Sequence, residues 1–192
     1  MPKIILGSSS AFRKAQLETL NLEFECFSPD IDEDAIKDQG LTPREVSIEL
    51  SKQKALKVKE KYPNDIIIAG DQVLNFKGEI FNKPLTKEKA IDHLLKLQGQ
   101  THELITSVTI VLNEQIIEHT IVATMKMREL TREQIEAYVT KDEPLWSCGA
   151  YKLETMGIAL FESIDCNDHS SIIGLPLLSV SSSLMKLGVK IL

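Results

Sequence analysis

The stretch IIIAGDQVLNFKGEIF, residues 66–81, decides the fold class. Three isoleucines in succession predict a buried strand, and the Lys-Gly pair at 77–78 predicts a tight turn into a second strand at 79–81. Asp71 follows the apolar run directly, although a carboxylate at the end of a buried strand is costly unless something there needs it. We therefore expect the strand at 65–76 to carry an acid with a function just after its three isoleucines.

Strands and helices alternate along the rest of the chain. The patterns predict strands at 3–7, 23–27, 101–112, 115–126 and 157–162, and helices at 11–20, 43–61, 86–97, 131–140 and 176–187. The two long strands flank Asn113-Glu114, which is typical of a hairpin. No internal repeat, low-complexity tract or flexible linker interrupts this order. The sequence thus predicts an α/β fold with a mixed sheet and flanking helices.

Length and charge limit the classes of function. A chain of 192 residues with 43% apolar side chains can form one substantial core, or one domain with two lobes. A net charge of −6 excludes a general surface for nucleic acid or anionic membranes, because such surfaces neutralise phosphates with Lys and Arg. A small anionic ligand remains compatible with this charge, since a local basic cluster can sit inside an acidic protein.

Cysteine spacing and apolar runs indicate the compartment in which the protein works. The three cysteines, Cys26, Cys148 and Cys166, form neither a C-x-x-C pair nor a zinc pattern with the histidines, which is typical of reduced thiols. The first residues lack the apolar core of a signal peptide, and no uninterrupted apolar run reaches the length of a membrane span. We expect a soluble, cytoplasmic protein with no membrane partner.

The segment GSSSAFRK, residues 7–14, passes from a strand through three serines into a helix. A helix start exposes unpaired N–H groups and the positive end of the dipole, and both favour a phosphate. Arg13 and Lys14 lie in this first turn, where a cation opposes the dipole by about 0.3–1 kcal/mol. Two interpretations remain open: a phosphate site around Ser8 and Arg13, or simple capping serines beside solvated cations. Phe12 lies at the edge of the apolar stripe of this helix.

Lys54 breaks the pattern of the long helix at 43–61. Val46, Leu50, Lys54 and Val58 follow one another at intervals of four, so an ammonium lies within an apolar stripe. The side chain could extend along the helix to solvent, or it could serve a buried site. Four further polar residues have equally ordinary interpretations as surface turns and solvated charges: Glu33, Asp71, Lys83 and Glu154.

The common signatures of binding and catalysis are missing. Residues 30–41 start like a calcium loop, but Ala35 stands where that loop needs Gly and Leu41 where it needs Glu. The sequence contains no G-x-x-x-x-G-K-[ST], G-x-G-x-x-G, G-x-S-x-G or H-E-x-x-H pattern. Any chemistry must therefore come from dispersed residues.

Nine short blocks along the chain together resemble one family. They are GSSSAFRK, DIDED, Lys54-Ala55, AGDQV, GEIFNKP, LQGQTHE, CGAYKLE, GIALFE and IIGLPL, in this order between residue 4 and about residue 188. Their order and spacing resemble the Maf-like family of nucleoside triphosphate pyrophosphatases. The resemblance implies a single Maf-like domain over residues 1–192, with the two-lobed Maf/ITPase-like α/β fold around a central cleft. It also implies cleavage between the α and β phosphates with a divalent cation, Mg²⁺ or Mn²⁺, and leaves a homodimer open.

The resemblance also assigns roles by matching positions. Asp71 matches the proposed catalytic base, and Glu33 matches an acid that helps Asp71 to hold the metal. Four residues match polar positions around the phosphates: Ser8, Arg13, Lys54 and Lys83. The acid after the three isoleucines would then activate water or share a hard cation.

Three positions separate the subfamilies. Pyrimidine-directed members have Arg, Thr and Gln where this chain has Phe12, Gln72 and Glu154, whereas members that act on 7-methyl-GTP have an aromatic residue, Gln and Glu. The chain is similar to the latter. A carboxylate can accept from both N1–H and the 2-amino group of guanine, and an aromatic ring suits the cationic 7-methyl base. The resemblance implies hydrolysis of 7-methyl-GTP, with dTTP/UTP hydrolysis or a nucleotide-binding regulator of cell division as alternatives.

Overall fold

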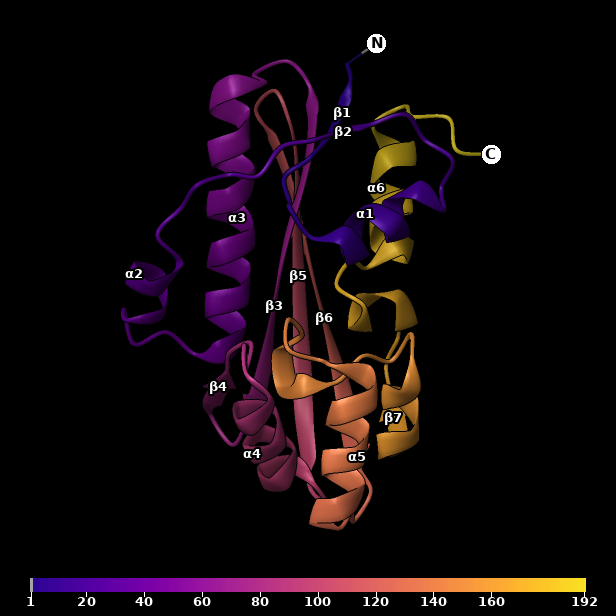
Figure 1. Cartoon of the computed structure of the whole chain (residues 1–192). Helices are drawn as coiled ribbons and strands as arrows, with labels where there is room; N and C mark the ends of the chain where they lie inside the picture. Colours follow the sequence, from indigo (N-terminus) through magenta and orange to yellow (C-terminus); the bar gives the residue numbers. More distant parts are fainter. Residues whose placement is uncertain (1) are drawn as a thin grey trace. The chain divides into compact units, whose positions relative to one another are not determined.

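The computed structural model describes residues 2–192, and these divide into two compact units (Figure 1). The first unit comprises residues 2–72, Thr106–Ile121 and Asp168–Leu192 of the described chain, and the second comprises Val73–Ile105 and Val122–Asn167. Seven strands form one mixed sheet in the order β2-β1-β3-β5-β6-β7, with β4 also paired to β3. Together with six α-helices in the described residues, this confirms the predicted α/β fold with a mixed sheet.

The sheet of the first unit begins with three parallel strands. Strand β1 (Ile4–Leu6) pairs with β2 (Glu25–Cys26) on one side and with β3 (Ile66–Phe76) on the other. The register places Ile5 opposite Ile67, and all three residues of β1 are buried. Continuous apolar runs of this kind are expected where helices cover both faces of parallel strands.

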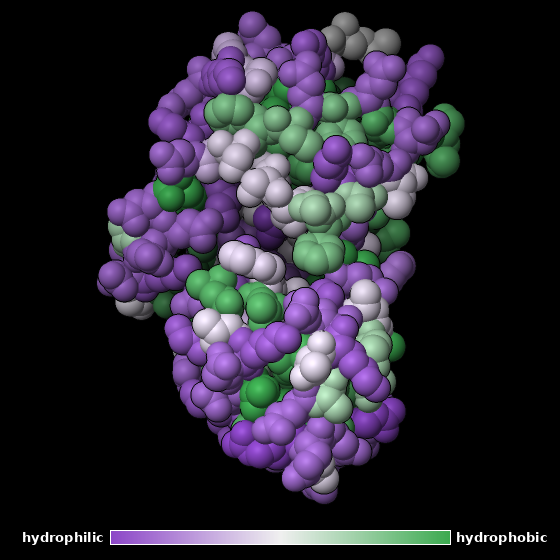
Figure 2. All heavy atoms as spheres, viewed as in Figure 1, coloured by the Kyte–Doolittle hydropathy of each residue, from purple (hydrophilic) through white to green (hydrophobic). Residues whose placement is uncertain are grey.

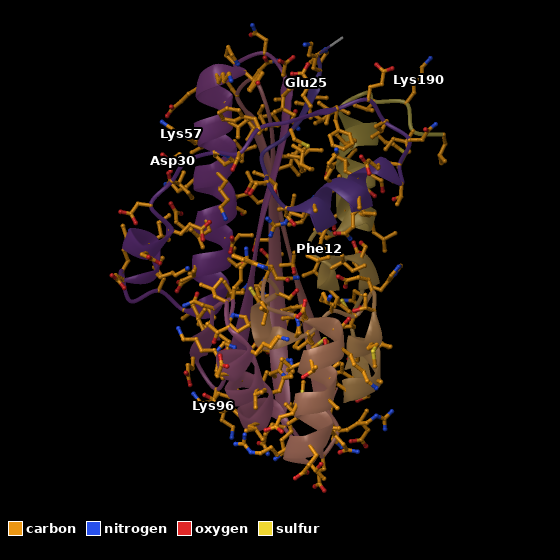
Figure 3. The ribbon with its side chains drawn as sticks, in the orientation of Figure 1. Phe12, Glu25, Asp30, Lys57, Lys96 and Lys190 are labelled. Atoms are coloured by element: carbon orange, nitrogen blue, oxygen red, sulfur yellow. The ribbon has the colours of Figure 1, made fainter. Side chains whose placement is uncertain are left out.

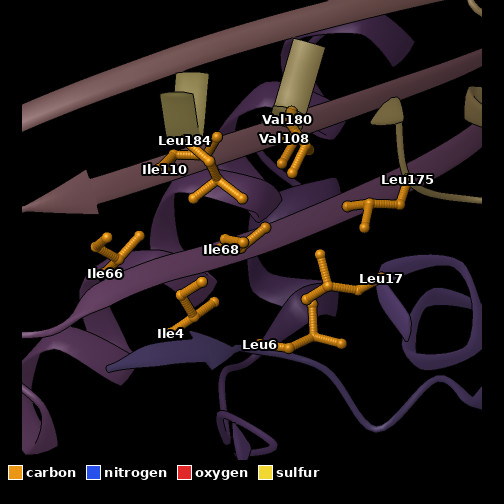
Figure 4. Packing of buried hydrophobic residues seen from close by; sticks show 10 residues of the cluster. All are labelled: Ile4, Leu6, Leu17, Ile66, Ile68, Val108, Ile110, Leu175, Val180 and Leu184. Carbon is orange, nitrogen blue, oxygen red and sulfur yellow. The ribbon is translucent and has the colours of Figure 1, made fainter. Parts of the chain in front are cut away.

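Helices cover both faces of this sheet, and the side chains of β1 and β3 alternate between them. On one face, strand residues pack against α1 (Ala11–Glu18) and α6 (Leu177–Lys186), as Figure 4 shows. This cluster contains Ile4, Leu6, Leu17, Ile66, Ile68, Val108, Ile110, Leu175, Val180 and Leu184. On the other face, Ile5 and Ile67 pack with Ala55 and Val58 of α3 (Pro43–Lys61). Each fully buried Leu, Ile or Val contributes roughly 1.5–3 kcal/mol, so this double layer holds the unit together.

A short helix, α2 (Glu33–Lys37), lies in the acidic run for which the sequence analysis predicted no element. Asp32 caps it, since the Asp32 carboxylate accepts from Ala35 N at 3.0 Å. Glu33 and Asp34 then fall in the first turn, where acids are favoured by the helix dipole. The acidic composition that made the segment look merely solvated is therefore what starts the helix.

The second unit combines two strand pairs with two helices. Strand β4 (Glu79–Phe81) pairs antiparallel with the end of β3, and β7 (Phe161–Asp165) pairs antiparallel with the end of β6 (Gln115–Met127). Helix α4 (Lys87–Leu97) packs against α5 (Arg132–Asp142), and β5 (Thr101–Leu112) contributes residues to both units. The turn at 77–78 has positive φ at both residues, 55° and 90°, which is typical of the predicted hairpin.

The predicted strand at 157–162 is wrong for its first four residues. Residues Met156–Leu160 form a 3₁₀ turn (η2), and the strand begins only at Phe161. Gly157 N donates to Lys152 O at 2.9 Å, and a Cβ on Gly157 would lie 2.3 Å from that oxygen. The apolar run fits a strand or a tight turn equally well, and the close backbone approach, which only glycine permits, decides for the turn. Two further 3₁₀ turns are η1 (Cys148–Ala150) and η3 (His169–Ile172).

The surface is mainly hydrophilic on the face drawn in Figure 2, with apolar residues in separate patches. Exposed large apolar side chains include Phe12, Trp146 and Leu178. None of the helices within residues 2–192 combines the length and apolar character that crossing a bilayer requires.

Candidate active site

Three of the predicted site residues meet in the first unit at one ammonium group. Lys54 Nζ lies 2.7 Å from Asp71 Oδ1 and 2.7 Å from Glu33 Oε1. Helix α3 presents the lysine, β3 presents Asp71, and the first turn of α2 presents Glu33. The arrangement brings together a proton acceptor, a cation and a second acid.

Burial makes this cluster electrostatically strong. The side chain of Lys54 is 12% exposed and that of Asp71 is 9% exposed, whereas Glu33 is 43% exposed. Lys54 does not extend to solvent, because its ammonium contacts the two acids; its role toward a phosphate stays a prediction. Because buried charges are costly when unpaired, Lys54 and Asp71 require each other, whereas Glu33 is partly exposed and also lies 3.9 Å from Lys37 Nζ.

A chain of buried hydroxyls fixes the backbone at Asp71. Ser47 Oγ on α3 lies within hydrogen-bond distance of Asp71 O, at 3.3 Å, and of Ser107 Oγ, at 2.9 Å, and Ser107 Oγ lies 3.0 Å from Thr120 Oγ1. Ser47 is not among the residues that the sequence predicts for the site. The available signal was a second polar position on the inner face of α3, one residue after Val46.

The segment after β1 places Ser8 and Arg13 next to the strand that carries Asp71. Ser10 caps α1, accepting from Arg13 N at 3.4 Å, and Ser8 Oγ accepts from Ser10 N at 3.1 Å and from Arg13 Nη1 at 3.4 Å. Arg13 Nε donates to Gly174 O at 2.8 Å. A Cβ added to Gly70 would lie 3.8 Å from Arg13 Nε, so the guanidinium passes beside the residue that precedes Asp71.

Gln72 uses its amide nitrogen within the protein. Nε2 lies 2.9 Å from Thr106 Oγ1, 2.9 Å from Ser171 O and 3.0 Å from Ile172 O. All three neighbours offer an oxygen acceptor, which sets the orientation of the amide. The amide of Gln72 is therefore held in one orientation, and its role in selecting the base stays a prediction.

Phe12 lies on the first turn of α1 and is labelled in Figure 3. Its side chain is 37% exposed, because it lies off the apolar stripe through which α1 packs on the sheet. The ring is accessible to a stacking partner.

Lys83 and Glu154 belong to the second unit, and both are exposed. Glu154 lies in a turn held by α5, because Lys152 N donates to Tyr138 Oη at 3.1 Å and Thr155 Oγ1 donates to Asp142 Oδ2 at 2.8 Å. Burial raises the pKa of Tyr138, so the phenol keeps its proton. Sequence reasoning missed Tyr138 and Asp142, since their contacts join segments that only the fold brings together. The grouping of Lys83 and Glu154 with Asp71 stays a prediction.

The sequence model of the Maf-like protein family matches residues 3–187. The chain belongs to the Maf-like protein family. This Maf-like protein is 37% identical over 182 residues to a protein of Bdellovibrio bacteriovorus named 7-methyl-GTP pyrophosphatase, with 95% of each chain covered. A Hahella chejuensis protein of the same name is 36% identical over 192 residues, covering 99% of this chain and 96% of that protein. Among solved structures, a HAM1 protein from Coxiella burnetii aligns over 98% of this chain and 99% of that chain, with a TM-score of 0.49 and 14% identity.

The Maf-like chain offers two carboxylates, rather than a complete cage, for a metal ion. Within residues 2–192 no group of three or more His, Cys, Asp or Glu side chains could hold one. Glu33 and Asp71 nevertheless each direct an oxygen to the same point, where Lys54 Nζ lies. Two carboxylate oxygens fit Mg²⁺ or Mn²⁺, because such ions keep several ligands from water and substrate phosphates.

The buried His102 of this Maf-like protein packs among aromatic side chains. His102 Nε2 lies 3.0 Å from Tyr151 Oη, and the ring is within 5.9 Å of the Phe161 ring centroid. Burial lowers the pKa of His102 to about 4. The imidazole is therefore neutral at pH 7 and packs as an aromatic side chain.

Proposed function

We propose that this Maf-like protein hydrolyses 7-methyl-GTP to 7-methyl-GMP and pyrophosphate, and so removes a modified nucleotide from the pool. The observation that carries the proposal is the buried Asp71, bound to Lys54 beside the start of α1. Two relatives at 36–37% identity that carry the name 7-methyl-GTP pyrophosphatase support the choice of substrate. We take residues 1–192 as one Maf-like domain, which the family match over residues 3–187 supports.

Asp71 is the general base of the proposed reaction. Its carboxylate accepts a proton from water while the water oxygen forms a bond to the α-phosphorus. The bond between the α-phosphorus and the bridging oxygen breaks, and the leaving group departs as pyrophosphate. Ser47 and Lys54 support this role, because one holds the Asp71 carbonyl and the other its Oδ1.

The phosphates bind at the start of α1. Helix N–H groups, the Ser8 hydroxyl and the guanidinium of Arg13 offer donors there. Because Arg13 Nε is already bound to Gly174 O, its Nη groups serve the substrate. Lys54 and the exposed Lys83 add positive charge for the triphosphate.

Glu33 and Asp71 would hold the divalent cation, Mg²⁺ or Mn²⁺. When bound, the cation neutralises charge on the triphosphate and on the leaving pyrophosphate. Lys54 contacts both acids in the structure, so the lysine is placed to exchange carboxylate contacts for phosphate contacts when substrate and cation arrive.

Glu154 and Phe12 select the base. The Glu154 carboxylate accepts from N1–H and the 2-amino group of guanine, and Phe12 stacks on the cationic 7-methyl ring. The exposure of both side chains supports this assignment. A cytoplasmic location and a homodimer stay predictions from the sequence.

The products of a nucleotide panel test the proposal. 7-methyl-GTP, GTP, dTTP, UTP and ATP are each incubated with Mg²⁺ or Mn²⁺, and the products are separated by anion-exchange chromatography. We expect monophosphate and pyrophosphate from 7-methyl-GTP, and no turnover with a chelator. Orthophosphate as the first product would contradict the reaction type, and faster turnover of UTP or dTTP would contradict the substrate.

A further inference from the structure

Residues 168–178, which we name the clamp turn, run through η3 to the start of α6. Their backbone carbonyls accept hydrogen bonds from side chains of three other elements. Their carbonyls accept as follows: Ser170 O and Leu175 O from Gln16 Nε2, at 2.7 and 3.2 Å; Ser171 O from Gln72 Nε2 and Thr106 Oγ1, both at 2.9 Å; Ile172 O from Gln72 Nε2, at 3.0 Å; and Gly174 O from Arg13 Nε, at 2.8 Å. The donors come from α1, β3 and β5. Two of them, Arg13 and Gln72, are predicted substrate ligands.

A buried acid within the clamp turn holds its shape. Asp168 is 2% exposed, and its Oδ1 accepts from Ser170 N at 3.1 Å and from Ser170 Oγ at 2.5 Å. Its Oδ2 accepts from Leu178 N at 3.0 Å, and Ser170 Oγ in turn accepts from Leu177 N at 2.7 Å. Helix α6 has Pro176 at its N-cap and no side-chain cap of its own. Ser170 and Asp168 therefore cap α6 from seven and ten residues upstream of the N–H groups that they accept from.

We propose that Asp168 is a positioning residue for Arg13, acting through the carbonyl of Gly174. Asp168 fixes both ends of the clamp turn, and the turn fixes the oxygen to which Arg13 Nε donates. A guanidinium anchored at Nε keeps its two NH₂ groups in one plane and direction, which is the pre-organisation that a bidentate phosphate contact needs. The proposal rests on the phosphate-binding role given to Arg13 above.

Two glycines support this route from Asp168 to Arg13. Gly174 has φ of 130°, a region that residues with a side chain rarely adopt, and a Cβ there would lie 3.5 Å from Arg13 Nε. Gly70 lies on the strand side, where a Cβ would be in ordinary contact, at 3.8 Å, with both Arg13 Nε and Gly174 O and in tight contact, at 3.1 Å, with Ser107 O. Arg13 thus lies between two backbones without side chains, and any movement of the clamp turn moves the carbonyl that orients it.

The competing explanation is that Asp168 only stabilises α6. Asp168→Asn tests the two explanations. An amide offers one acceptor oxygen and two N–H groups, whereas the neighbours of Asp168 are N–H and O–H donors, so the substitution weakens the hydrogen bonds that hold the clamp turn. Val180→Ala is the matched control: Val180 is fully buried on α6, so its truncation destabilises the same helix without touching the clamp-turn hydrogen bonds. Arg13→Ala and the double variant Asp168→Asn/Arg13→Ala complete a double-mutant cycle with the parent and Asp168→Asn.

The readouts are kcat/KM for 7-methyl-GTP, the Kd of tripolyphosphate by calorimetry, and Tm. We expect Asp168→Asn to lower kcat/KM by about tenfold or more, and the double variant to lie within about threefold of Arg13→Ala alone. Val180→Ala should lower Tm as much as Asp168→Asn and change kcat/KM by less than about twofold. Independent, multiplying effects of Asp168→Asn and Arg13→Ala would overturn the proposal, as would an equal loss of kcat/KM in Val180→Ala.

Two additions keep the test decisive. Should Asp168→Asn fail to fold, Ser170→Ala removes the bridge to Leu177 N while leaving the carboxylate, and its coupling to Arg13→Ala is measured instead. Should the parent turn over no 7-methyl-GTP, the proposed substrate is wrong, and the cycle is run on the Kd of tripolyphosphate. Coupling in that Kd supports the positioning role, and its absence overturns it.

Discussion

Lys54 Nζ lies 2.7 Å from Asp71 Oδ1, so a buried acid of the candidate site is paired with a lysine from a different element. Asp71→Asn keeps a side-chain oxygen for Lys54 and removes the proton acceptor. We expect kcat to fall by about 10²–10⁴-fold, with nucleotide binding retained, because general base catalysis contributes on that scale. Pyrophosphate release and calorimetric binding measure the two effects. Asp165→Asn, at an exposed acid on β7, is the control, and a catalytically competent Asp71→Asn protein would exclude the general-base role.

Lys54→Met should cost both activity and stability. The sequence alone predicts a loss of activity far larger than the loss of stability, but the structure shows that the substitution removes the lysine partner of the buried Asp71, whereas Glu33 keeps Lys37 Nζ at 3.9 Å. We expect the free energy of unfolding to fall by roughly 2 kcal/mol in urea titrations, discounted for the partial exposure of Glu33. Lys57→Met, which breaks an exposed pair with Glu60 on the same helix, should leave the free energy of unfolding nearly unchanged, because solvent screens exposed ion pairs. Equal effects of the two substitutions would contradict the electrostatic account, and full activity of Lys54→Met would remove the lysine from the site.

Gly174→Ala should weaken the proposed phosphate binding by Arg13 without any change of charge. At φ of 130°, a side chain adds strain of roughly 1–3 kcal/mol, and relief of that strain moves the carbonyl that accepts from Arg13 Nε. We expect a lower Tm and a lower kcat/KM. Gly40→Ala is the control, since φ there is 72° and open space surrounds the added Cβ. If both substitutions lower Tm and neither lowers kcat/KM, the Gly174 carbonyl does not orient the arginine.

His102 should make the protein less stable in mild acid. In the native protein burial lowers the pKa of His102 from 6.5 to about 4, so between these values the unfolded chain binds a proton that the native chain does not. The free energy of unfolding therefore falls as pH falls from 6.5 to 4, by roughly 3 kcal/mol over the window. Urea titrations of the parent and of His102→Gln at pH 7, 5.5 and 4.5 measure this. The two curves should converge as pH falls, and parallel curves would show that His102 is not the source.

Much of the first unit follows from local sequence. The isoleucines of β3 predict the central strand, and the interruption of an apolar stripe by Lys54 marks a polar site on α3. The Ser-Ser-Ser start of α1 predicts a helix terminus with unpaired donors. These signals are local because periodicity and capping involve residues within one or two turns of each other.

The remainder depends on contacts between segments distant in sequence. Asp168 looks like a surface residue beside Asn167 and His169, and only its contacts with the start of α6 reveal its role. The sequence does not predict that the Gln72 amide nitrogen donates to the carbonyls of Ser171 and Ile172, about a hundred residues away, and its contact with a base stays a prediction. The strand at 157–160 was wrong because a close backbone approach, invisible to hydrophobic patterns, decides its conformation.

Base selection by Glu154 and Phe12 makes two separable predictions. Glu154→Gln should lower kcat/KM for both 7-methyl-GTP and GTP by about one to two powers of ten, because a charge-assisted pair contributes roughly 1.5–3 kcal/mol. Phe12→Ala should instead narrow the preference for 7-methyl-GTP over GTP, since stacking a cationic base contributes roughly 0.5–2 kcal/mol more. Specificity constants for 7-methyl-GTP, GTP and UTP on both variants test this. An unchanged ranking in both would exclude these side chains from base recognition and leave the reaction type intact.

Two hydroxyl pairs between α3 and β5 determine the register of the helix on the strand. Ser47 Oγ lies 2.9 Å from Ser107 Oγ, and Ser51 Oγ lies 3.0 Å from Thr109 Oγ1. All four residues are buried. Aliphatic side chains can slide past one another at little cost, but two hydroxyl pairs match in one register only, and a displaced helix would bury unpaired donors. Lys54 follows Ser51 by one helical turn. The hydroxyl pairs therefore determine which residue of α3 reaches Asp71, and a slipped helix would present a neighbouring side chain in place of the ammonium.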